Sequence, residues 1–148
     1  MKILVINGPN LNMLGKRDPK KYGKITLMEI INKLRKQGKR LDCELDFFQS
    51  NHEGAIIDFL QKNSSRKSDG LIINPGALIR YAYSLRQALV DFNKPFIELH
   101  MADINKTGVN KKVNILDDVP NRIGQISGLK EKGYFNALEK IVNFIKKI

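Results

Sequence analysis

Short apolar runs alternate along this chain with longer segments in which apolar residues recur every three or four positions. The short runs predict five strands, and the longer segments predict four helices. The strands are expected at residues 2–6, 44–48, 70–73, 96–99 and 122–126, and the helices at 26 to about 38, 53 to about 65, 81 to about 92, and 133–148. Residues 101–120 are polar and predict neither. Strands that alternate with helices indicate a parallel sheet. We therefore predict one α/β domain over residues 1–148, with a flavodoxin-like, doubly wound five-stranded parallel sheet and helices on both faces.

Local signals support some of these boundaries. Thr26 followed by Glu29 matches a capping box at the start of the first helix. Gly38 marks its expected end or a break. Ser50 or Asn51 would cap the second helix, and supporting a site is the secondary interpretation of that segment.

Charge and composition restrict the class of protein. The 148 residues include 26 Lys and Arg against 15 Asp and Glu, a formal charge of +11. Such a charge suggests nucleic acid as a partner, but the positive residues are scattered over predicted helix faces, so nucleic acid is not expected. The excess of positive charge instead favours encounters with small anions. The chain has one cysteine and no apolar run long enough to span a bilayer. We expect a cytoplasmic protein that does not enter a membrane.

Polar side chains gather where three of the predicted strands end. Ligands of open α/β sheets bind at the carboxyl ends of the strands, so these residues are expected to share one crevice. The set comprises Asn10, Asn12, Arg17, Tyr22, Asn74, Gly76, Glu98 and His100.

Two groups in this set are candidates for proton transfer. A phenol ordinarily titrates near about pH 10, so Tyr22 needs a cation such as Arg17 to stabilise its phenolate and make it a base. The alternative is a surface tyrosine beside an incidental arginine. Residues two apart in a strand share a face, so Glu98 could support an imidazolium on His100 and make it a general acid. The alternative is a structural histidine at the sheet edge.

The remaining motifs are less specific. Asn74 offers both a donor and an acceptor, and Gly76 permits close approach of a ligand, but a plain turn also explains them. The chain has no glycine-rich dinucleotide motif, no phosphate-binding loop and no metal-ligand spacing. We therefore expect neither a cofactor nor a metal.

Taken together, the motifs resemble the type II 3-dehydroquinate dehydratases. The resemblance covers nearly the whole chain in the right order. The matching segments are Gly8-Pro9-Asn10-Leu11-Asn12 with Gly15, Arg17, Pro19, Tyr22 and Gly23, then Phe48-Gln49-Ser50-Asn51 with Glu53-Gly54 and Ile57-Asp58, then Ile72-Ile73-Asn74-Pro75-Gly76-Ala77, Ile97-Glu98 with His100, and Gly128 with Gly133-Tyr134.

This resemblance implies cofactor-free dehydration of 3-dehydroquinate to 3-dehydroshikimate through an enolate, in the shikimate pathway. It implies that Tyr22, tuned by Arg17, is the base and that Asn10 acts on the enolate through a water. His100, supported by Glu98, would be the acid, and Asn74 would orient the substrate. It also implies a trimer-based dodecamer, a small anionic substrate and a lid formed by the loop that carries Tyr22.

The chain departs from the family at positions that bind substrate. The family usually has Thr-His where this chain has Ile79-Arg80, and Asp where it has Gln87. The family's aliphatic residue and Ser after the catalytic His are here Met101 and Ala102. Lys111 stands where an Arg binds a ring hydroxyl. Arg80 could compensate by meeting a carboxylate.

Three hypotheses follow from these departures. The first is a dehydratase with an altered pocket. The second is a relative that acts on another hydroxy-ketone acid or has lost activity. The third, of another class, is a binding module whose basic surface engages nucleic acid or an anionic protein.

Overall fold

In the computed structural model, five parallel strands form one sheet in the order β2-β1-β3-β4-β5. The structure describes residues 1–148 except for the side chains of residues 63 and 64. This confirms the predicted α/β fold, and the strand order is that of flavodoxin. The strands are β1 (Lys2–Asn7), β2 (Glu44–Gln49), β3 (Gly70–Asn74), β4 (Phe96–His100) and β5 (Arg122–Ser127).

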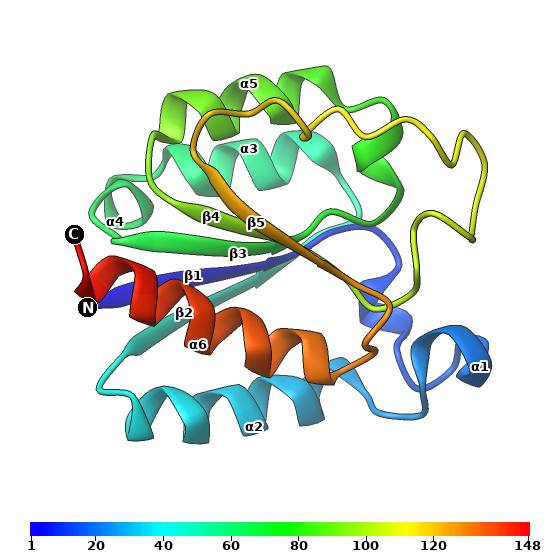
Figure 1. Cartoon of the computed structure of the whole chain (residues 1–148), viewed down its shortest axis with the longest axis horizontal. Helices are drawn as coiled ribbons and strands as arrows, with labels where there is room; N and C mark the ends of the chain where they lie inside the picture. The colour runs from blue at the N-terminus through cyan, green and yellow to red at the C-terminus, as the bar shows by residue number, and fades with distance from the viewer.

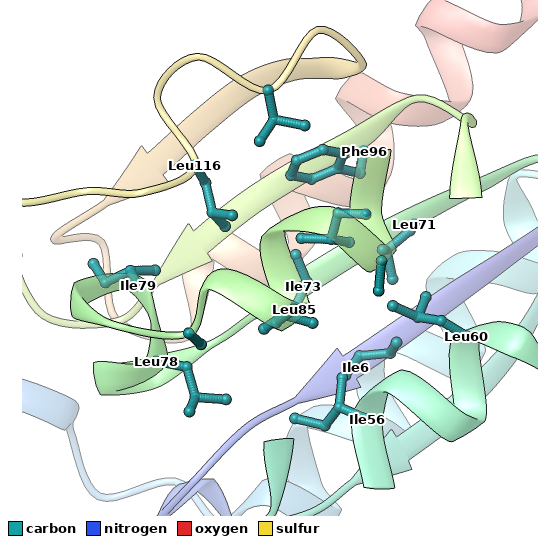
Figure 2. Close-up of a cluster of buried hydrophobic side chains, with 14 of the residues drawn as sticks. Ile6, Ile56, Leu60, Leu71, Ile73, Leu78, Ile79, Leu85, Phe96 and Leu116 are labelled. Atoms are coloured by element: carbon teal, nitrogen blue, oxygen red, sulfur yellow. The ribbon is translucent and has the colours of Figure 1, made fainter. Parts of the chain in front are cut away.

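Helices cover both faces of the sheet (Figure 1). On one face lie α2 (Leu27–Arg40) and α6 (Lys132–Lys146), and on the other lie α3 (Glu53–Gln61) and α5 (Tyr83–Phe92). Successive side chains of a strand point to opposite faces. Ile3 and Val5 of β1 therefore belong to one apolar cluster, and Leu4 and Ile6 belong to the other. Figure 2 shows the second cluster, between β1, β3, β4 and helices α3 and α5. Burial of both clusters fixes the sheet.

Two predicted helix boundaries change for physical reasons. The Thr26–Glu29 capping box forms, but α2 continues through Gly38 to Arg40. Gly38 is there for packing rather than to end the helix, because a Cβ at this position would lie 2.9 Å from the Cys43 carbonyl oxygen. The second predicted helix ends at Gln61 instead of near residue 65, since Lys62 is extended, and the short α4 (Asn63–Arg66) follows.

The third predicted helix begins at Tyr83, as α5, rather than at residue 81. A 3-10 helix, η2 (Gly76–Arg80), precedes α5. Residues 101–121 form turns and bends, in line with their polar composition.

The predicted side-chain cap of α3 is wrong. His52 is the N-cap residue and its side chain makes no capping bond. The Asn51 amide oxygen instead accepts from the backbone N–H of Asn10, 3.0 Å away. The segment that was expected chiefly to cap a helix therefore supports the loop after β1.

Close contact between the ends of β1 and β3 creates the site. The backbone N–H of Gly8 donates to the Asn74 carbonyl over 2.7 Å. A Cβ on Gly8 would lie 2.8 Å from the Pro75 carbonyl oxygen, so only glycine permits this approach. No helix in the part of the chain that the structure describes is long and apolar enough to cross a membrane.

Candidate active site

A cavity of about 170 Å³ opens at the carboxyl ends of β1, β3 and β4. Most of the residues singled out from the sequence line it. They are Asn10, Arg17, Tyr22, Asn74, Gly76, Arg80, His100, Met101 and Ala102. The loop after β1, η2 and the segment after β4 thus meet at one place, as the parallel topology predicts.

Tyr22 is the last residue of the short helix α1 (Pro19–Tyr22). Asp18 caps this helix by accepting from the backbone N–H of Lys20 over 2.9 Å, and Pro19 favours the helical start. The Arg17 guanidinium carbon lies 3.7 Å from the centre of the Tyr22 ring. The arginine therefore stacks on the ring face, where the π electrons attract a cation. A cation therefore lies next to the Tyr22 side chain, where it would offset negative charge on the ring oxygen.

His100 ends β4 and is buried. Its Nε2 lies 2.6 Å from an oxygen of Glu98, which shares its face of the strand. Glu98 is fully buried. Because the carboxylate engages Nε2, the ring nitrogen available for a second partner is Nδ1. The expected pairing of these two side chains is present.

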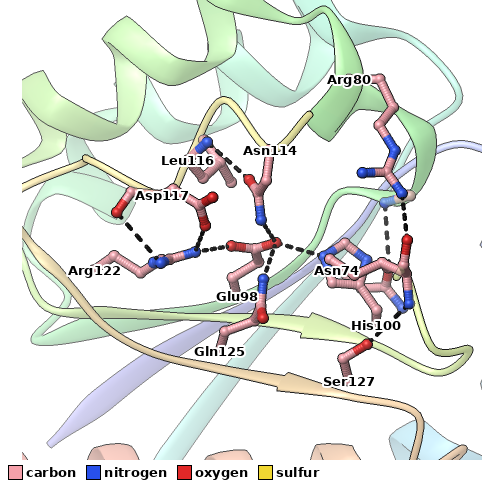
Figure 3. A network of polar contacts seen from close by, with 12 residues as sticks. Asn74, Arg80, Glu98, His100, Asn114, Leu116, Asp117, Arg122, Gln125 and Ser127 are labelled. Atoms are coloured by element: carbon pink, nitrogen blue, oxygen red, sulfur yellow. Dashed lines mark hydrogen bonds and ion pairs between the residues drawn. The ribbon is translucent and has the colours of Figure 1, made fainter. Parts of the chain in front are cut away.

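The Glu98 carboxylate is the centre of a larger network (Figure 3). It accepts from Asn114 over 2.7 Å, from Gln125 over 3.2 Å and from Arg122. Burial alone would raise the pKa of Glu98, but hydrogen bonds from His100, Arg122 and Gln125, with the charge of His100, hold that pKa below its ordinary value. The carboxylate is therefore ionised at neutral pH and can compensate the charge of an imidazolium.

The sequence reasoning missed the three residues that bind Glu98 besides His100. Gln125 lies beside Glu98 in the register of β4 and β5, but it is exposed on an edge strand, where a polar side chain gives no signal of a partner. Asn114 lies in the segment without regular structure, so no periodic pattern could place it. Arg122 starts β5, where an arginine also fits plain solvent exposure.

A second buried network holds Asn74. Its amide nitrogen donates to the Tyr134 hydroxyl over 3.0 Å, and its amide oxygen accepts from the backbone N–H of Gly76 over 3.3 Å. The Tyr134 hydroxyl in turn donates to the side-chain oxygen of Asn7. Burial raises the pKa of the Tyr134 phenol, so it remains a hydrogen-bond donor. Tyr134 therefore fixes the orientation of an amide in the cavity wall.

Replacing Tyr134 by Phe is expected to lower the free energy of unfolding by about 1–3 kcal/mol, because the amides of Asn7 and Asn74 each lose a buried partner. Urea unfolding measures this change. Tyr83→Phe is the matched control, since Tyr83 is 67% exposed. Equal stability of the two variants would show that the Tyr134 hydroxyl holds neither amide.

Besides the fully buried Glu98, two of the predicted site residues do not line the cavity. Asn12 is exposed on the 3-10 helix η1 (Leu11–Met13), and the Lys111 side chain is exposed on the segment after β4. Neither lines the cavity. Asn10 is the N-cap residue of η1, in which Leu11 lines the cavity and the next residue, Asn12, is exposed. Gln87 is also exposed and donates to Asp91 one helical turn away.

Other chemistries find little support in the described residues. Among them no group of three or more His, Cys, Asp or Glu side chains is placed to hold a metal ion. Cys43 is buried away from the cavity, and burial raises the pKa of its thiol, which disfavours the nucleophilic thiolate.

Comparison with known proteins identifies the family of this chain. The family model for dehydroquinase class II covers residues 1–142. The chain belongs to the class II dehydroquinase family. A curated relative, the 3-dehydroquinate dehydratase of Halothermothrix orenii, is 45% identical over 146 residues, which are 99% of this chain and 97% of that protein. Another, from Roseiflexus castenholzii, is 46% identical over 139 residues, 94% of this chain and 87% of its own.

Solved structures agree with the sequence comparison. The crystal structure of the type II dehydroquinase from Butyrivibrio crossotus has a TM-score of 0.88 and 40% sequence identity, and the match covers 97% of each chain. The enzyme from Propionibacterium acnes has a TM-score of 0.87 at 30% identity, over 96% of each chain. The class II dehydroquinase fold therefore extends over nearly the whole chain.

Proposed function

We propose that this chain catalyses the dehydration of 3-dehydroquinate to 3-dehydroshikimate without a cofactor. One observation carries the proposal: Tyr22 and the paired His100 line the same cavity in a class II dehydroquinase. A phenol held by a cation and an imidazole held by a carboxylate supply the base and the acid that an elimination next to a ketone requires. The relatives named 3-dehydroquinate dehydratase give the substrate.

In the first step, the Tyr22 phenolate oxygen takes a proton from the carbon next to the substrate ketone. The electrons of that C–H bond move into the ketone and form an enolate. Arg17, stacked on the ring, compensates the charge of the phenolate before the transfer. Asn10, at the cavity wall, would stabilise the enolate oxygen through a water.

In the second step, the enolate collapses and the C–O bond to the hydroxyl on the next carbon breaks. A proton on His100 Nδ1 passes to that oxygen, which leaves as water. Glu98, hydrogen-bonded at Nε2, keeps the ring oriented and compensates its charge before the transfer. Tyr22 then returns its proton to solvent and His100 takes one up, so the cycle is balanced.

The residues that line the cavity also favour an enolate over an imine. No lysine is among the lining residues that the structure describes, and an imine with the ketone would need a lysine amine. The base and the acid therefore act on the substrate directly.

A second candidate function is the dehydration of a related but less polar hydroxy-ketone acid. Part of the cavity wall is apolar, at Ile79, Met101, Ala102, Ile104 and Val109. A ring hydroxyl placed against this wall would lose its hydrogen bonds with water and find no side-chain partner, at a cost of about 1–3 kcal/mol. A substrate with fewer hydroxyls would avoid this cost.

A turnover assay separates the two candidates. The purified chain is mixed with 3-dehydroquinate, and the absorbance of the conjugated enone product is followed. Product formation proportional to the enzyme concentration is the expected result. A folded chain that leaves 3-dehydroquinate unchanged at millimolar concentration, but dehydrates an analogue lacking one ring hydroxyl, would contradict the main proposal and support the second candidate.

A further inference from the structure

Among the described residues, the charged side chains that line the cavity are all positive. Two arginines, Arg17 and Arg80, line it, and no Asp or Glu does so in the part of the chain that the structure describes. Arg17 faces the ring of Tyr22. Arg80 comes from a different element, the end of η2. The cavity therefore holds one cation that the proposed proton transfers do not use.

Arg80 is bound only by neutral groups among the described residues. It donates to the backbone carbonyls of Ile104 over 2.7 Å, of Lys111 over 3.2 Å and of Val113. Figure 3 shows the side chain extending from η2 toward the residues around His100. Carbonyl oxygens fix the direction of a guanidinium but do not cancel its charge. By contrast, Arg86 and Arg122 each form an ion pair, with Asp118 and Glu98 respectively.

The guanidinium retains donors for another partner. Arginine has five N–H groups, and three hydrogen bonds to carbonyls are present. A carboxylate is the group that arginine binds with two parallel hydrogen bonds. Arg80 is partly buried, so such a contact would be screened less than one on the open surface.

The same contacts hold a wall of the cavity. Ile104 lines the cavity, as do Thr107, Gly108 and Val109 farther along the segment that Arg80 binds. This segment has no helix or strand of its own to fix it. Arg80 therefore has two roles: it places a positive charge at the cavity, and it holds the segment that forms part of the cavity wall.

We propose that Arg80 binds the carboxylate of the substrate and is a specificity-determining residue of this chain. The inference rests on the proposed function, because it takes the substrate to be a small hydroxy-ketone acid. A neutral donor would suffice to hold three carbonyls, whereas an uncompensated charge at the cavity is explained by an anionic ligand. The carboxylate lies toward Arg80, and the carbon that loses a proton lies toward Tyr22.

The test compares 3-dehydroquinate with its primary amide, which has nearly the same shape and no charge. Binding of both compounds is measured by titration calorimetry with Tyr22→Phe added to every chain compared, the otherwise unaltered chain included, so that conversion is slow, and turnover is measured separately in chains that keep Tyr22. In the unaltered chain the amide is expected to bind about 10- to 100-fold more weakly, as for loss of a hydrogen-bonded charge pair. In Arg80→Gln the acid and the amide are expected to bind about equally, because both meet a neutral side chain.

Two further variants separate charge from a structural role. Arg80→Lys keeps the charge without the planar fork, so it should restore part of the preference for the acid. Arg86→Gln is the matched control, since Arg86 also attaches the segment, through Asp118, but does not line the cavity. It should keep the preference of the unaltered chain.

An acid-to-amide ratio that is the same in Arg80→Gln and in the unaltered chain would overturn the assignment, even if the enzyme turns over 3-dehydroquinate. Conversely, binding that depends on Arg80 in this way, without turnover, would support the assignment and contradict the proposed function. If the unaltered chain binds neither compound at millimolar concentration, both proposals fail.

Discussion

Tyr22→Phe is expected to lower kcat for 3-dehydroquinate by about 10²- to 10⁴-fold, the range for loss of a general base. Phe keeps the ring on which Arg17 stacks at 3.7 Å, so the loop and the cavity wall should stay in place. Only the oxygen that accepts the proton is removed. KM is therefore expected to change by no more than a few-fold, because the interaction is made chiefly in the transition state. Steady-state kinetics measures both constants.

The control for this prediction is Tyr83→Phe. Tyr83 is exposed at the start of α5 and does not line the cavity, so its kcat should match that of the unaltered chain. A Tyr22→Phe enzyme with full kcat would exclude this phenol as the base.

Glu98→Gln is expected to have the second large effect, on both stability and activity. The substitution leaves the Arg122 charge, which is 16% exposed, with only Asp117 as its carboxylate partner. Breaking a buried pair in this way should lower the free energy of unfolding by about 3 kcal/mol. His100 also loses the charge that compensates an imidazolium, so kcat should fall about 100-fold. Chemical unfolding and steady-state kinetics test the two parts.

The contribution of Glu98 to stability is expected to depend on pH in a definite direction. The pKa of Glu98 in the folded chain lies below its ordinary value of 4.5 because His100, Arg122 and Gln125 stabilise the carboxylate against the cost of burial. Between the two values the unfolded chain binds more protons, so stability increases with pH there. The contribution is fully present above pH 4.5 and is lost as the pH falls through the lower, folded value. Glu98→Gln removes this contribution.

Asp118→Asn provides the comparison for an exposed pair. Asp118 meets Arg86 on the surface, where an ion pair contributes little. Its variant should be much closer to the unaltered chain in stability than Glu98→Gln. The same loss in both variants, or an unchanged acid dependence in Glu98→Gln, would contradict a special role for the buried carboxylate.

The fold was predictable because the apolar pattern is dense. Each strand is a short apolar run next to a turn signal, and each helix has a regular apolar face, so the alternation leads directly to a parallel sheet. Boundaries were less certain where one residue serves two purposes. Gly38 is a helix breaker in sequence terms, yet close packing against Cys43 and Leu45 places it inside α2.

The site was predictable where it follows the strand ends. Tyr22, Asn74 and His100 come together because parallel strands end at one edge of the sheet. The residues that support them were not predictable, because their partners are distant in sequence. Tyr134 reaches Asn7 across 127 positions, and Asn114 reaches Glu98 from a segment without periodicity. The direction of Arg80 depends on carbonyls of that same segment.

The measurement that tests the account most directly is deuterium exchange at the carbon next to the ketone, followed by NMR in D₂O for the unaltered chain, His100→Gln and Tyr22→Phe. If Tyr22 removes the proton and His100 expels the hydroxyl, His100→Gln should still exchange this hydrogen while its dehydration rate falls about 100-fold or more. In Tyr22→Phe both the exchange and the dehydration should fall together, by about 10²- to 10⁴-fold. Exchange by Tyr22→Phe at the rate of the unaltered chain, or full dehydration by His100→Gln, would contradict the assigned roles.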